Sequence, residues 1–392
     1  MHVFQTGHEE LVHDIKYDYY GKHVATASSD QHIKVFDLDS ASSAWVLNDS
    51  WKAHDSSVVK LSWAHPEFSG QRLLASCSYD RTVKIWQESS NELHGSGRRW
   101  VKLATLASES FGPIYDVVFA PSHLGLKLAC VGSDGITHIY ESLEPSDLSI
   151  WCLTSEIPVL NSSLPAKSLQ SSFCIEWCPA KFSKVEMLCI IALDQGFIYG
   201  TGMETQHTNV NNERAGDGLN ISNKQAFDSQ VLHDNNEKTE VEGAYSAKHS
   251  SAGDSTDTAK YVRLCSLPEH NGLIRSVSWA PSMGRSYHLI ATGCKDGFIR
   301  IFKATEANDN GLKIELTAKL DDHKQEVWRV AWNSTGTILS SAGDDGKVRL
   351  WKQNYMNEWQ CMSEINSSNR SDYRLDGDHD RPPFVQRPST TR

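Results

Sequence analysis

The sequence predicts an all-β fold built from six repeated, blade-like units of short antiparallel strands. Three observations support this prediction. A short motif that ends in an aromatic residue recurs along the chain, a histidine precedes most copies at a nearly constant distance, and apolar residues alternate within each copy. A repeat of about 50 residues with period-2 alternation is more typical of a ring of blades than of a β-sandwich.

The motif combines small residues, an aspartate, an alternating apolar run and an aromatic residue six positions after the aspartate. Its clear copies end at Phe36, Trp86, Tyr140, Phe302 and Trp351. A weaker copy reads ALDQGFIYG, in which Gly200 replaces the aromatic residue. Alternation in segments such as IKVF and VRLW indicates strands with one buried face.

A histidine stands upstream of four copies and marks the start of another alternating run. The pairs of histidine and motif aspartate, separated by 22 or 26 residues, are His8 and Asp30, His54 and Asp80, His270 and Asp296, and His323 and Asp345. Turn signals such as YYGK and NSTGT lie between the two marks. Each unit is therefore expected to be a meander of short antiparallel strands.

One interval breaks the period. Gly200 and Phe302 are 102 residues apart, and residues 203–260 between them are rich in Asn, Asp, Ser and Gly without a sustained period of 2 or 3.6. Such a segment cannot offset an ordering cost of ~1–2 kcal/mol per residue. The sequence thus predicts blades one to four in residues 1–202, a disordered insertion at 203–260, blades five and six in 261–365, and a disordered tail at 366–392.

Composition excludes several classes of protein. The formal net charge of −11, without any basic run, argues against sequence-independent binding to nucleic acid or to anionic membranes. Nine cysteines without a C-x-x-C pair are expected to be buried thiols in a reducing compartment. The first ten residues lack the features of a signal peptide, so export is not expected. The sequence gives no indication of a cofactor.

The recurring polar residues predict a structural network in each blade, because buried polar groups must find partners. In this interpretation Asp orients the His ring, a Ser two positions before the Asp forms a bridge, and a Trp indole donates to that Ser. The set His54, Ser78, Asp80 and Trp86 is the complete one. The partial sets are His8, Ser28 and Asp30, which end in Phe36; Asp134 alone; His270 with Asp296; and His323, Asp345 and Trp351, with Gly343 in the place of Ser.

Three enzyme-like or ligand-like patterns have simpler explanations. HEELVH at residues 8–13 places its histidines five apart, whereas a zincin helix needs four. Cys174 and Cys178 alternate along a strand and lack companion ligands, so buried thiols are expected. Four tryptophans that could suggest a base-stacking platform occupy equal places in each repeat, which indicates core packing: Trp63, Trp177, Trp279 and Trp332. No catalytic residue and no metal site are predicted.

The His…Ser-x-Asp…Trp pattern resembles that of WD-repeat β-propellers. Three longer segments, HDIKYDYYGKHVATASSDQHIKVFD, WAHPEFSGQRLLASCSYDRTVKIW and QEVWRVAWNSTGTILSSAGDDGKVRLWKQNYMNEW, are similar more specifically to the Seh-type nucleoporins. The resemblance covers about residues 8–200 and 261–361. It implies a non-enzymatic scaffold subunit of the Y-complex in the outer ring of the nuclear pore, at the nuclear envelope, supporting transport of protein and mRNA. It also implies a share in a coat-like complex of the GATOR/SEA type that regulates TOR signalling, with a location at the lysosomal or vacuolar surface.

Counting strands predicts how a partner docks. The chain continues after Trp351 into EWQCMSEI, so the last blade has its own outer strand, and the segment before Gly7 has no partner blade within the chain. An open ring with unpaired edges would recruit strands from another chain. We therefore expect a partner to insert a β-blade in trans, with an outer strand contributed by His2, Val3, Phe4 and Gln5. In the family that this chain resembles, the partner is a helical scaffold nucleoporin.

Two alternatives remain open at this point. A subunit of the COPII-type vesicle coat would share the open ring and the inserted blade. A WD-repeat adaptor that binds short peptides would instead carry exposed Arg and aromatic residues at one mouth of the ring, which the sequence alone does not reveal.

Overall fold

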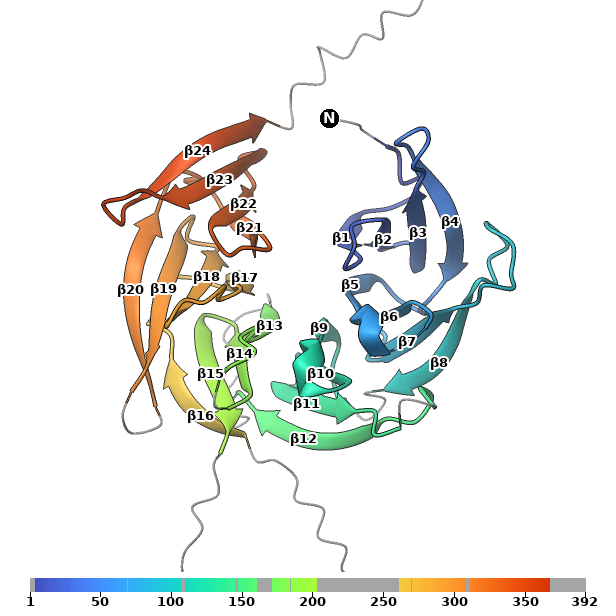
Figure 1. Ribbon diagram of the computed structural model, residues 1–392, viewed down its shortest axis with the longest axis horizontal. Helices are drawn as coiled ribbons and strands as arrows, with labels where there is room; N and C mark the ends of the chain where they lie inside the picture. Colours follow the sequence, from blue (N-terminus) through green and yellow to red (C-terminus); the bar gives the residue numbers. More distant parts are fainter. Residues whose placement is uncertain are drawn as a thin grey trace, which may run out of the picture. The chain divides into compact units, whose positions relative to one another are not determined.

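A computed structural model describes the parts of the chain that form the strands. The described residues are 4–68, 70–106, 110–144, 147–160, 171–183, 185–202, 261–268, 270–307 and 311–366. They form 24 strands in six four-stranded antiparallel sheets, together with two short 3-10 helices (Figure 1). The prediction of a six-bladed, all-β propeller is confirmed.

The strands follow one another in chain order, four to a blade. Blades one to three comprise β1 (Val12–Tyr17), β2 (His23–Ser28), β3 (His32–Leu38), β4 (Trp45–Lys52), β5 (Val58–Trp63), β6 (Leu73–Ser78), β7 (Val83–Glu88), β8 (Trp100–Leu106), β9 (Ile114–Phe119), β10 (Lys127–Gly132), β11 (Ile136–Glu141) and β12 (Cys152–Pro158). Blades four to six comprise β13 (Phe173–Trp177), β14 (Met187–Ala192), β15 (Gln195–Thr201), β16 (Tyr261–Ser266), β17 (Ile274–Trp279), β18 (His288–Cys294), β19 (Ile299–Glu306), β20 (Leu312–Leu320), β21 (Val327–Trp332), β22 (Ile338–Gly343), β23 (Lys347–Gln353) and β24 (Trp359–Asn366).

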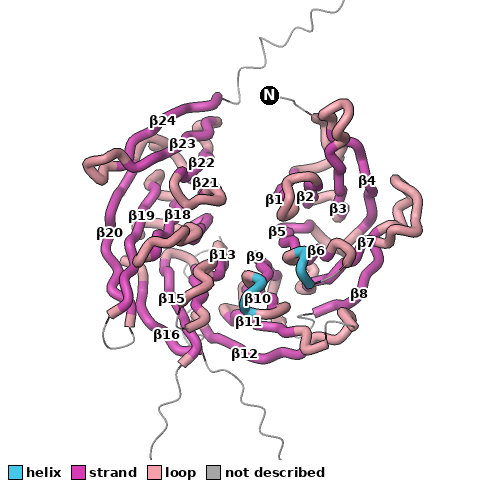
Figure 2. The backbone as a smooth tube through the Cα atoms, in the orientation of Figure 1, coloured by secondary structure: helices cyan, strands magenta, loops and turns pink. Residues whose placement is uncertain are grey.

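Each blade is a meander whose first strand lies at the centre of the ring and whose fourth strand lies outside (Figure 1). The tube in Figure 2 shows that the two 3-10 helices, η1 (Pro66–Phe68) and η2 (Ser122–Leu124), lie in the connections after the first strands of blades two and three. No helix in the described part of the chain has the length and apolar character needed to cross a bilayer.

The insertion lies inside a blade rather than between blades. Strand β16, which follows residues 203–260, pairs with β15 and completes blade four. The predicted division, with blades one to four in 1–202 and two blades in 261–365, is therefore wrong by one strand. Strand β16, with the sequence YVRLCS, is only partly buried. It therefore carries little of the alternation that identifies the inner strands. The disorder predicted for 203–260 and for 367–392 falls outside the described residues, whereas Asn366, which the prediction places in the tail, is the last residue of β24.

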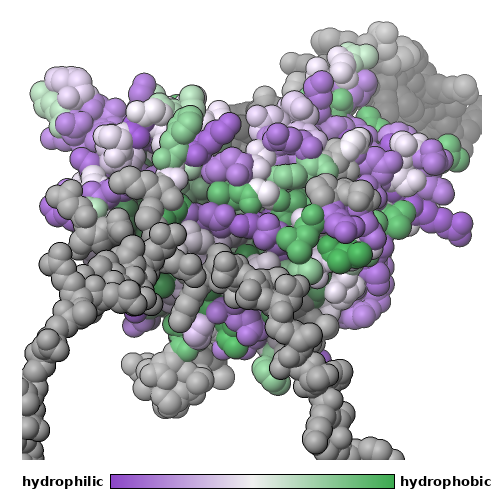
Figure 3. All heavy atoms as spheres, turned by 60° about the horizontal axis from the view of Figure 1, so that its bottom comes forward, coloured by the Kyte–Doolittle hydropathy of each residue, from purple (hydrophilic) through white to green (hydrophobic). Residues whose placement is uncertain are grey.

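Apolar side chains pack mainly between neighbouring blades. The buried residues of the described chain form five clusters, one at each junction from blades one and two to blades five and six. A closed ring of six blades would need a sixth junction, between blades six and one. Elsewhere on the propeller, hydrophobic side chains are interspersed with hydrophilic ones, as Figure 3 shows for the side of blades three and four.

Candidate docking gap

The first strand of blade one has a bare face. Ile15 occupies the central position of β1 and is 51% exposed. Its counterparts, two residues before the end of each other inner strand, are at most 6% exposed: Leu61, Val117, Ile175, Val277 and Val330. Those residues pack against the preceding blade. Among the described residues no blade precedes blade one and packs on this face, so Ile15 remains in solvent.

Two neighbours of Ile15 show the same difference. Val12 is 37% exposed, whereas Val58, Ile114 and Val327 at the same place are fully buried. Tyr17 at the end of β1 is 57% exposed. An apolar stripe along one edge of the ring is thus uncovered.

Blade six is bare on the opposite side. Val348 on β23 and Ile365 on β24 are adjacent in the register and are 37% and 38% exposed. In blade five the residue equivalent to Val348 is Ile299, which is 1% exposed because blade six covers it. The two bare faces, of blade one and of blade six, bound what we call the docking gap; no strand of the described residues pairs the sheet of β21–β24 with that of β1–β4, which lie on either side of it in Figure 1.

The N-terminal segment does not close this gap. Strand β24 pairs only with β23, and the described residues before β1 form no strand. Phe4 instead packs on blade one, with its ring centroid 5.1 Å from that of Phe36 and 5.9 Å from that of Trp45. Gln5 follows it without strand pairing, and His2 and Val3 lie outside the described residues.

One ion pair crosses the gap at the central channel. Nη2 of Arg329 on β21 lies 2.8 Å from Oδ1 of Asp14 on β1. Burial raises the pKa of Asp14, but the charge of Arg329, with those of Lys60 and Lys16, outweighs it and keeps that pKa below its usual value. The carboxylate also accepts the backbone N–H of Leu61 at 3.1 Å. Asp14 therefore links blade one to blade two and blade six.

The repeated tryptophans join blades as well as packing between them. The indole Nε1 of Trp63 donates to the carbonyl of Lys16 in blade one at 2.9 Å. Trp332 donates in the same way to Ser278 in blade five at 3.1 Å. Trp279 is the exception, since its buried Nε1 has no hydrogen-bond partner among the described residues.

The structural network of blade two contains a different serine from the one predicted. Nδ1 of His54 lies 2.8 Å from Asp80, and Nε2 lies 2.8 Å from Oγ of Ser76. The indole of Trp86 donates to the same Ser76 at 2.9 Å. Because Asp80 accepts from Nδ1, Nε2 is the acceptor of the Ser76 hydroxyl, and burial lowers the pKa of His54.

Ser78 has another role. Its hydroxyl accepts the backbone N–H of Asp80 at 3.1 Å and donates to the carbonyl of Ser56 at 3.2 Å, so it stabilises the turn. Trp86 stands opposite Leu74 in the register, which places Ser76 two residues away and Ser78 four residues away at the strand end. A separation of about 7 Å is within reach of the indole, whereas about 14 Å is not. The bridging hydroxyl therefore belongs four positions before the aspartate.

Blade six then has a complete network, contrary to the prediction. Ser341 lies four positions before Asp345, and its hydroxyl lies 2.7 Å from His323 and 2.9 Å from the Trp351 indole. Nδ1 of His323 lies 2.9 Å from Asp345. Gly343 is required for another reason, because a Cβ there would lie only 2.9 Å from the His323 ring.

The other blades keep parts of the network. In blade one, His8 lies 2.8 Å from both Asp30 and the Thr26 hydroxyl, and Ser28 holds the turn by accepting the Asp30 N–H. In blade three, Ser110 takes the place of histidine and donates to Asp134 at 2.6 Å.

Blade five departs from the prediction in its His–Asp pair. His270 lies 2.9 Å from the Thr292 hydroxyl, but Asp296 is held by Arg300 at 2.6 Å instead of by the histidine. Burial, with the charge of Arg300, lowers the pKa of His270 to about 4. Arg300 donates from two nitrogens to the two oxygens of this carboxylate. In blade six the equivalent Arg349 also bonds to Asp345, but there His323 keeps its place beside the aspartate.

The ligand-like patterns do not converge in space. Nε2 of His13 lies 2.6 Å from the Ser29 hydroxyl, whereas His8 belongs to the network of blade one. Cys174 and Cys178 are buried in the cluster between blades four and five, and burial raises the pKa of the Cys178 thiol to about 12. In the described ranges, no group of three or more His, Cys, Asp or Glu side chains could hold a metal ion.

The fold and the networks define a WD-repeat propeller, and comparison with known proteins agrees. The family model "WD domain, G-beta repeat" matches residues 1–37, 45–87, 261–303 and 314–352. Nucleoporin SEH1 of Saccharomyces cerevisiae is 47% identical over 93% of this chain and 99% of its own length. Its counterparts in Schizosaccharomyces pombe and Homo sapiens are 34% and 35% identical over 93% and 90% of this chain, and over 95% and 85% of their own lengths. The chain belongs to the SEH1 family of nucleoporins, and it is a non-enzymatic scaffold protein.

Proposed function

We propose that this chain is a scaffold subunit of the outer ring of the nuclear pore, where it docks a helical scaffold nucleoporin by accepting a β-blade of that partner into the docking gap. Its relatives are named nucleoporins, which supports the location at the pore and other pore subunits as partners. In such a complex the chain supports transport of protein and mRNA through the pore.

The observation that carries the docking mode is the exposure of Ile15, 51% against at most 6% at equivalent positions. Full burial of an aliphatic side chain of this size stabilises by about 1.5–3 kcal/mol. A blade inserted between Ile15 and Val348 would cover both bare faces and add the missing junction. Strands of the partner would also satisfy the exposed edges by β-augmentation.

The N-terminal residues His2, Val3, Phe4 and Gln5 would supply the outer strand of the inserted blade. The contacts of Phe4 with Phe36 and Trp45 of blade one support a role for Phe4 beside that blade. A chain lacking residues 1–7 should bind the partner blade more weakly than a Phe4→Ala variant, which removes only the ring contacts. Undiminished binding by the shortened chain would contradict the strand role.

Affinity purification of the tagged full-length chain, followed by mass spectrometry, tests the function. Helical scaffold nucleoporins should dominate, and the tagged protein should lie at the nuclear rim. Co-purification mainly of vesicle-coat subunits, with a location at exit sites of the endoplasmic reticulum, would contradict the proposal. Subunits of a GATOR/SEA-type complex beside the nucleoporins would support the shared role in TOR signalling and a second location at the vacuolar surface.

The variants Ile15→Asp and Val348→Asp test the gap itself. A carboxylate buried without a partner costs several kcal/mol, and about 1.4 kcal/mol corresponds to tenfold in affinity. Each variant should therefore bind the nucleoporin partner at least tenfold more weakly than the wild type. Its thermal midpoint should stay near that of the wild type, because both side chains are exposed in the free protein. Leu316→Asp on β20, where the leucine is 47% exposed, is the matched control and should keep the partner. Retention of the partner by both gap variants would contradict the docking mode.

A further inference from the structure

In three blades the third residue of the inner strand accepts a backbone N–H from the blade that follows it in the ring. These acceptors are Asp14, Asp116 and Ser276, and the distances are 3.1, 3.1 and 3.3 Å. Arg329 is the third residue of β21, the inner strand of blade six. Its side chain therefore faces the docking gap.

Arg329 uses only part of its hydrogen-bonding capacity. A guanidinium group carries five N–H donors. Among the described residues the Arg329 group makes one hydrogen bond, from Nη2 to Asp14 at 2.8 Å. The side chain is 35% exposed, so solvent reaches the other donors in the free protein. A blade that fills the docking gap excludes this solvent, and a buried charged group whose donors lack acceptors is strongly unfavourable. The inserted blade must therefore bring an acceptor to Arg329.

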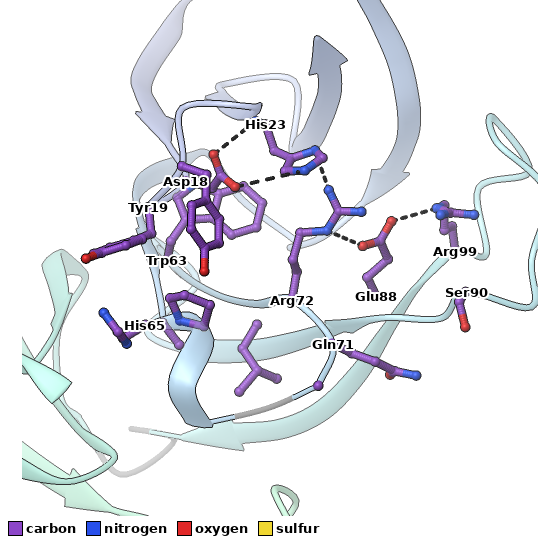
Figure 4. A pocket seen from close by; sticks show the side chains of 15 residues that line it. Asp18, Tyr19, His23, Trp63, His65, Gln71, Arg72, Glu88, Ser90 and Arg99 are labelled. Carbon is purple, nitrogen blue, oxygen red and sulfur yellow. Dashed lines mark hydrogen bonds and ion pairs between the residues drawn. The ribbon is translucent and has the colours of Figure 1, made fainter. Parts of the chain in front are cut away.

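Arginines at a filled junction show what a covered guanidinium group requires. Figure 4 shows Arg72 and Arg99 on either side of the Glu88 carboxylate, in the cavity between blades one and two. Each of them also uses a second nitrogen, in the case of Arg99 for the carbonyl of Glu92 at 2.6 Å. Both groups are thus bonded through two nitrogens, whereas Arg329 is bonded through one.

The charges around Asp14 favour a negatively charged acceptor. Three cations share the Asp14 carboxylate: Arg329, Lys60 and Lys16. Against the effect of burial, their charges hold its pKa below its usual value. Two other carboxyl groups line the same channel, and in the part of the chain that the structure describes neither lies within 4.0 Å of an Arg329 nitrogen: Asp116 and Glu176. Burial also raises the pKa of Glu176 to about 7, so this group is partly neutral at physiological pH.

We propose that the third residue of the inner strand of the inserted blade is an aspartate or glutamate whose carboxylate binds Arg329, and that this ion pair selects the partner. In the docking mode proposed above, on which this assignment rests, the inner strand that follows β21 belongs to the partner. Its third residue then stands to Arg329 as Asp14, the third residue of β1, stands to it in the free chain. The same carboxylate faces the N–H of Ile15, as Asp14 faces that of Leu61. A guanidinium group binds a carboxylate through two parallel N–H donors, which makes the contact specific as well as strong.

Binding of the nucleoporin that co-purifies with the chain tests this assignment. Arg329→Gln and Asp14→Asn both remove the ion pair within the chain, but only Arg329→Gln removes the group that binds the partner. In isothermal titration calorimetry Arg329→Gln should bind the full-length nucleoporin about tenfold more weakly than the wild type, whereas Asp14→Asn should stay within about threefold of it. Arg275→Gln is the matched control and should bind as the wild type does, because Arg275 lies on the inner strand of blade five and pairs with Glu326.

A charge exchange locates the carboxylate of the partner. Arg329→Glu should lose the nucleoporin. Replacement of one acidic residue in the inserted segment of the nucleoporin by lysine should then restore binding to this variant by about tenfold. Restoration by none of these replacements would assign the acceptor to the partner's backbone and overturn the proposal.

Two other results would overturn the proposal, and they are distinct from a failure of the docking mode. Equal loss of binding in Arg329→Gln and Asp14→Asn would show that Arg329 acts only through the ion pair within the ring. Undiminished binding by Arg329→Gln, while Ile15→Asp loses the partner, would leave the docking mode standing and remove this ion pair from it. Retention of the partner by both Ile15→Asp and Val348→Asp would instead overturn the docking mode and the ion pair with it.

Discussion

Arg329 on β21 donates to Asp14 on β1 at 2.8 Å, and this ion pair joins the last blade of the ring to the first. The same position holds an acceptor in blades one, three and five, namely Asp14, Asp116 and Ser276, whereas Lys60 occupies it in blade two and Cys174 in blade four. Asp14 accepts the backbone N–H of Leu61 and Asp116 that of Ile175. Arg329 is a donor, so it cannot accept the amide of a following strand. It donates to Asp14 and so links blade six to blade one at the channel.

The first prediction concerns this ion pair. Asp14→Asn should keep the bond to the Leu61 amide but remove the charge that faces Arg329. Because a hydrogen bond between charged groups contributes about 1.5–3 kcal/mol, the free energy of unfolding should fall by about 2 kcal/mol. Chemical denaturation followed by tryptophan fluorescence measures this change.

Asp321→Asn is the matched control, since Asp321 pairs with Lys324 at 2.6 Å but both side chains are more than half exposed. Exposed pairs contribute little, so this variant should stay within about 0.5 kcal/mol of the wild type. Equal effects of the two substitutions would show that the ion pair across the gap does not stabilise the ring.

The repeat predicts the six blades because the inner strands are buried on one or both faces. Their apolar residues must therefore follow the same regular pattern in every blade. Outer strands have no such requirement. Strand β16, with the pattern YVRLCS, was therefore not recognised as the last strand of blade four. In blades one, two and six the histidine and the aspartate of the motif bond to each other, but in blade five Arg300 binds the aspartate instead of His270. The choice between Ser76 and Ser78 depends on the register of β6 against β7, which one sequence does not contain.

The number of strands predicts an open ring with residues 2–5 beside the inserted blade, but it does not identify Ile15 or Val348. Ile15 and Leu61 occupy equal places in the repeat and are both aliphatic. Only the absence of a preceding blade leaves Ile15 exposed while Leu61 is fully buried. The signal was available in principle, because the first unit of an open ring must present the face that every other unit buries.

The second prediction concerns Ser76, which serves two partners. Ser76→Ala leaves the buried N–H of Trp86 without an acceptor and His54 without its second partner, and an unsatisfied buried polar group costs about 1–3 kcal/mol. The free energy of unfolding should fall by about 2–3 kcal/mol. Thr26→Val in blade one is the comparison, because Phe36 has no N–H to satisfy there, and it should cost about 1 kcal/mol. Denaturant titration of both variants compares them, and a larger loss for Thr26→Val would contradict the assignment.

The third prediction compares two tryptophans at equivalent positions. Trp63→Phe removes a donor that bonds to the Lys16 carbonyl and should destabilise the protein by about 1 kcal/mol beyond the effect of the smaller ring. Trp279→Phe removes a buried N–H that lacks an acceptor among the described residues, so its loss should be smaller. Thermal unfolding measured by circular dichroism should place the midpoint of Trp279→Phe above that of Trp63→Phe. The reverse order would show that these indoles contribute by packing alone.

The fourth prediction concerns pH. Burial, with the charge of Arg300, lowers the pKa of His270 from 6.5 to about 4 in the folded state. Between these values the unfolded chain binds more protons than the folded one, so the stability from neutral His270 is complete above pH 6.5 and is lost as pH falls towards 4. A difference of this size corresponds to about 3 kcal/mol.

The variant His270→Gln keeps a group able to bond Thr292, but this group does not titrate. Its free energy of unfolding should therefore fall less than that of the wild type from pH 6.5 to 4. Urea titrations at half-unit steps measure both slopes, and parallel slopes would mean that His270 is not held neutral by its surroundings. The motif carboxylates do not account for a loss of stability between pH 6.5 and 4. The pKa values of Asp80, Asp296 and Asp345 are lowered below 3.8, so their contribution to stability is lost only in stronger acid.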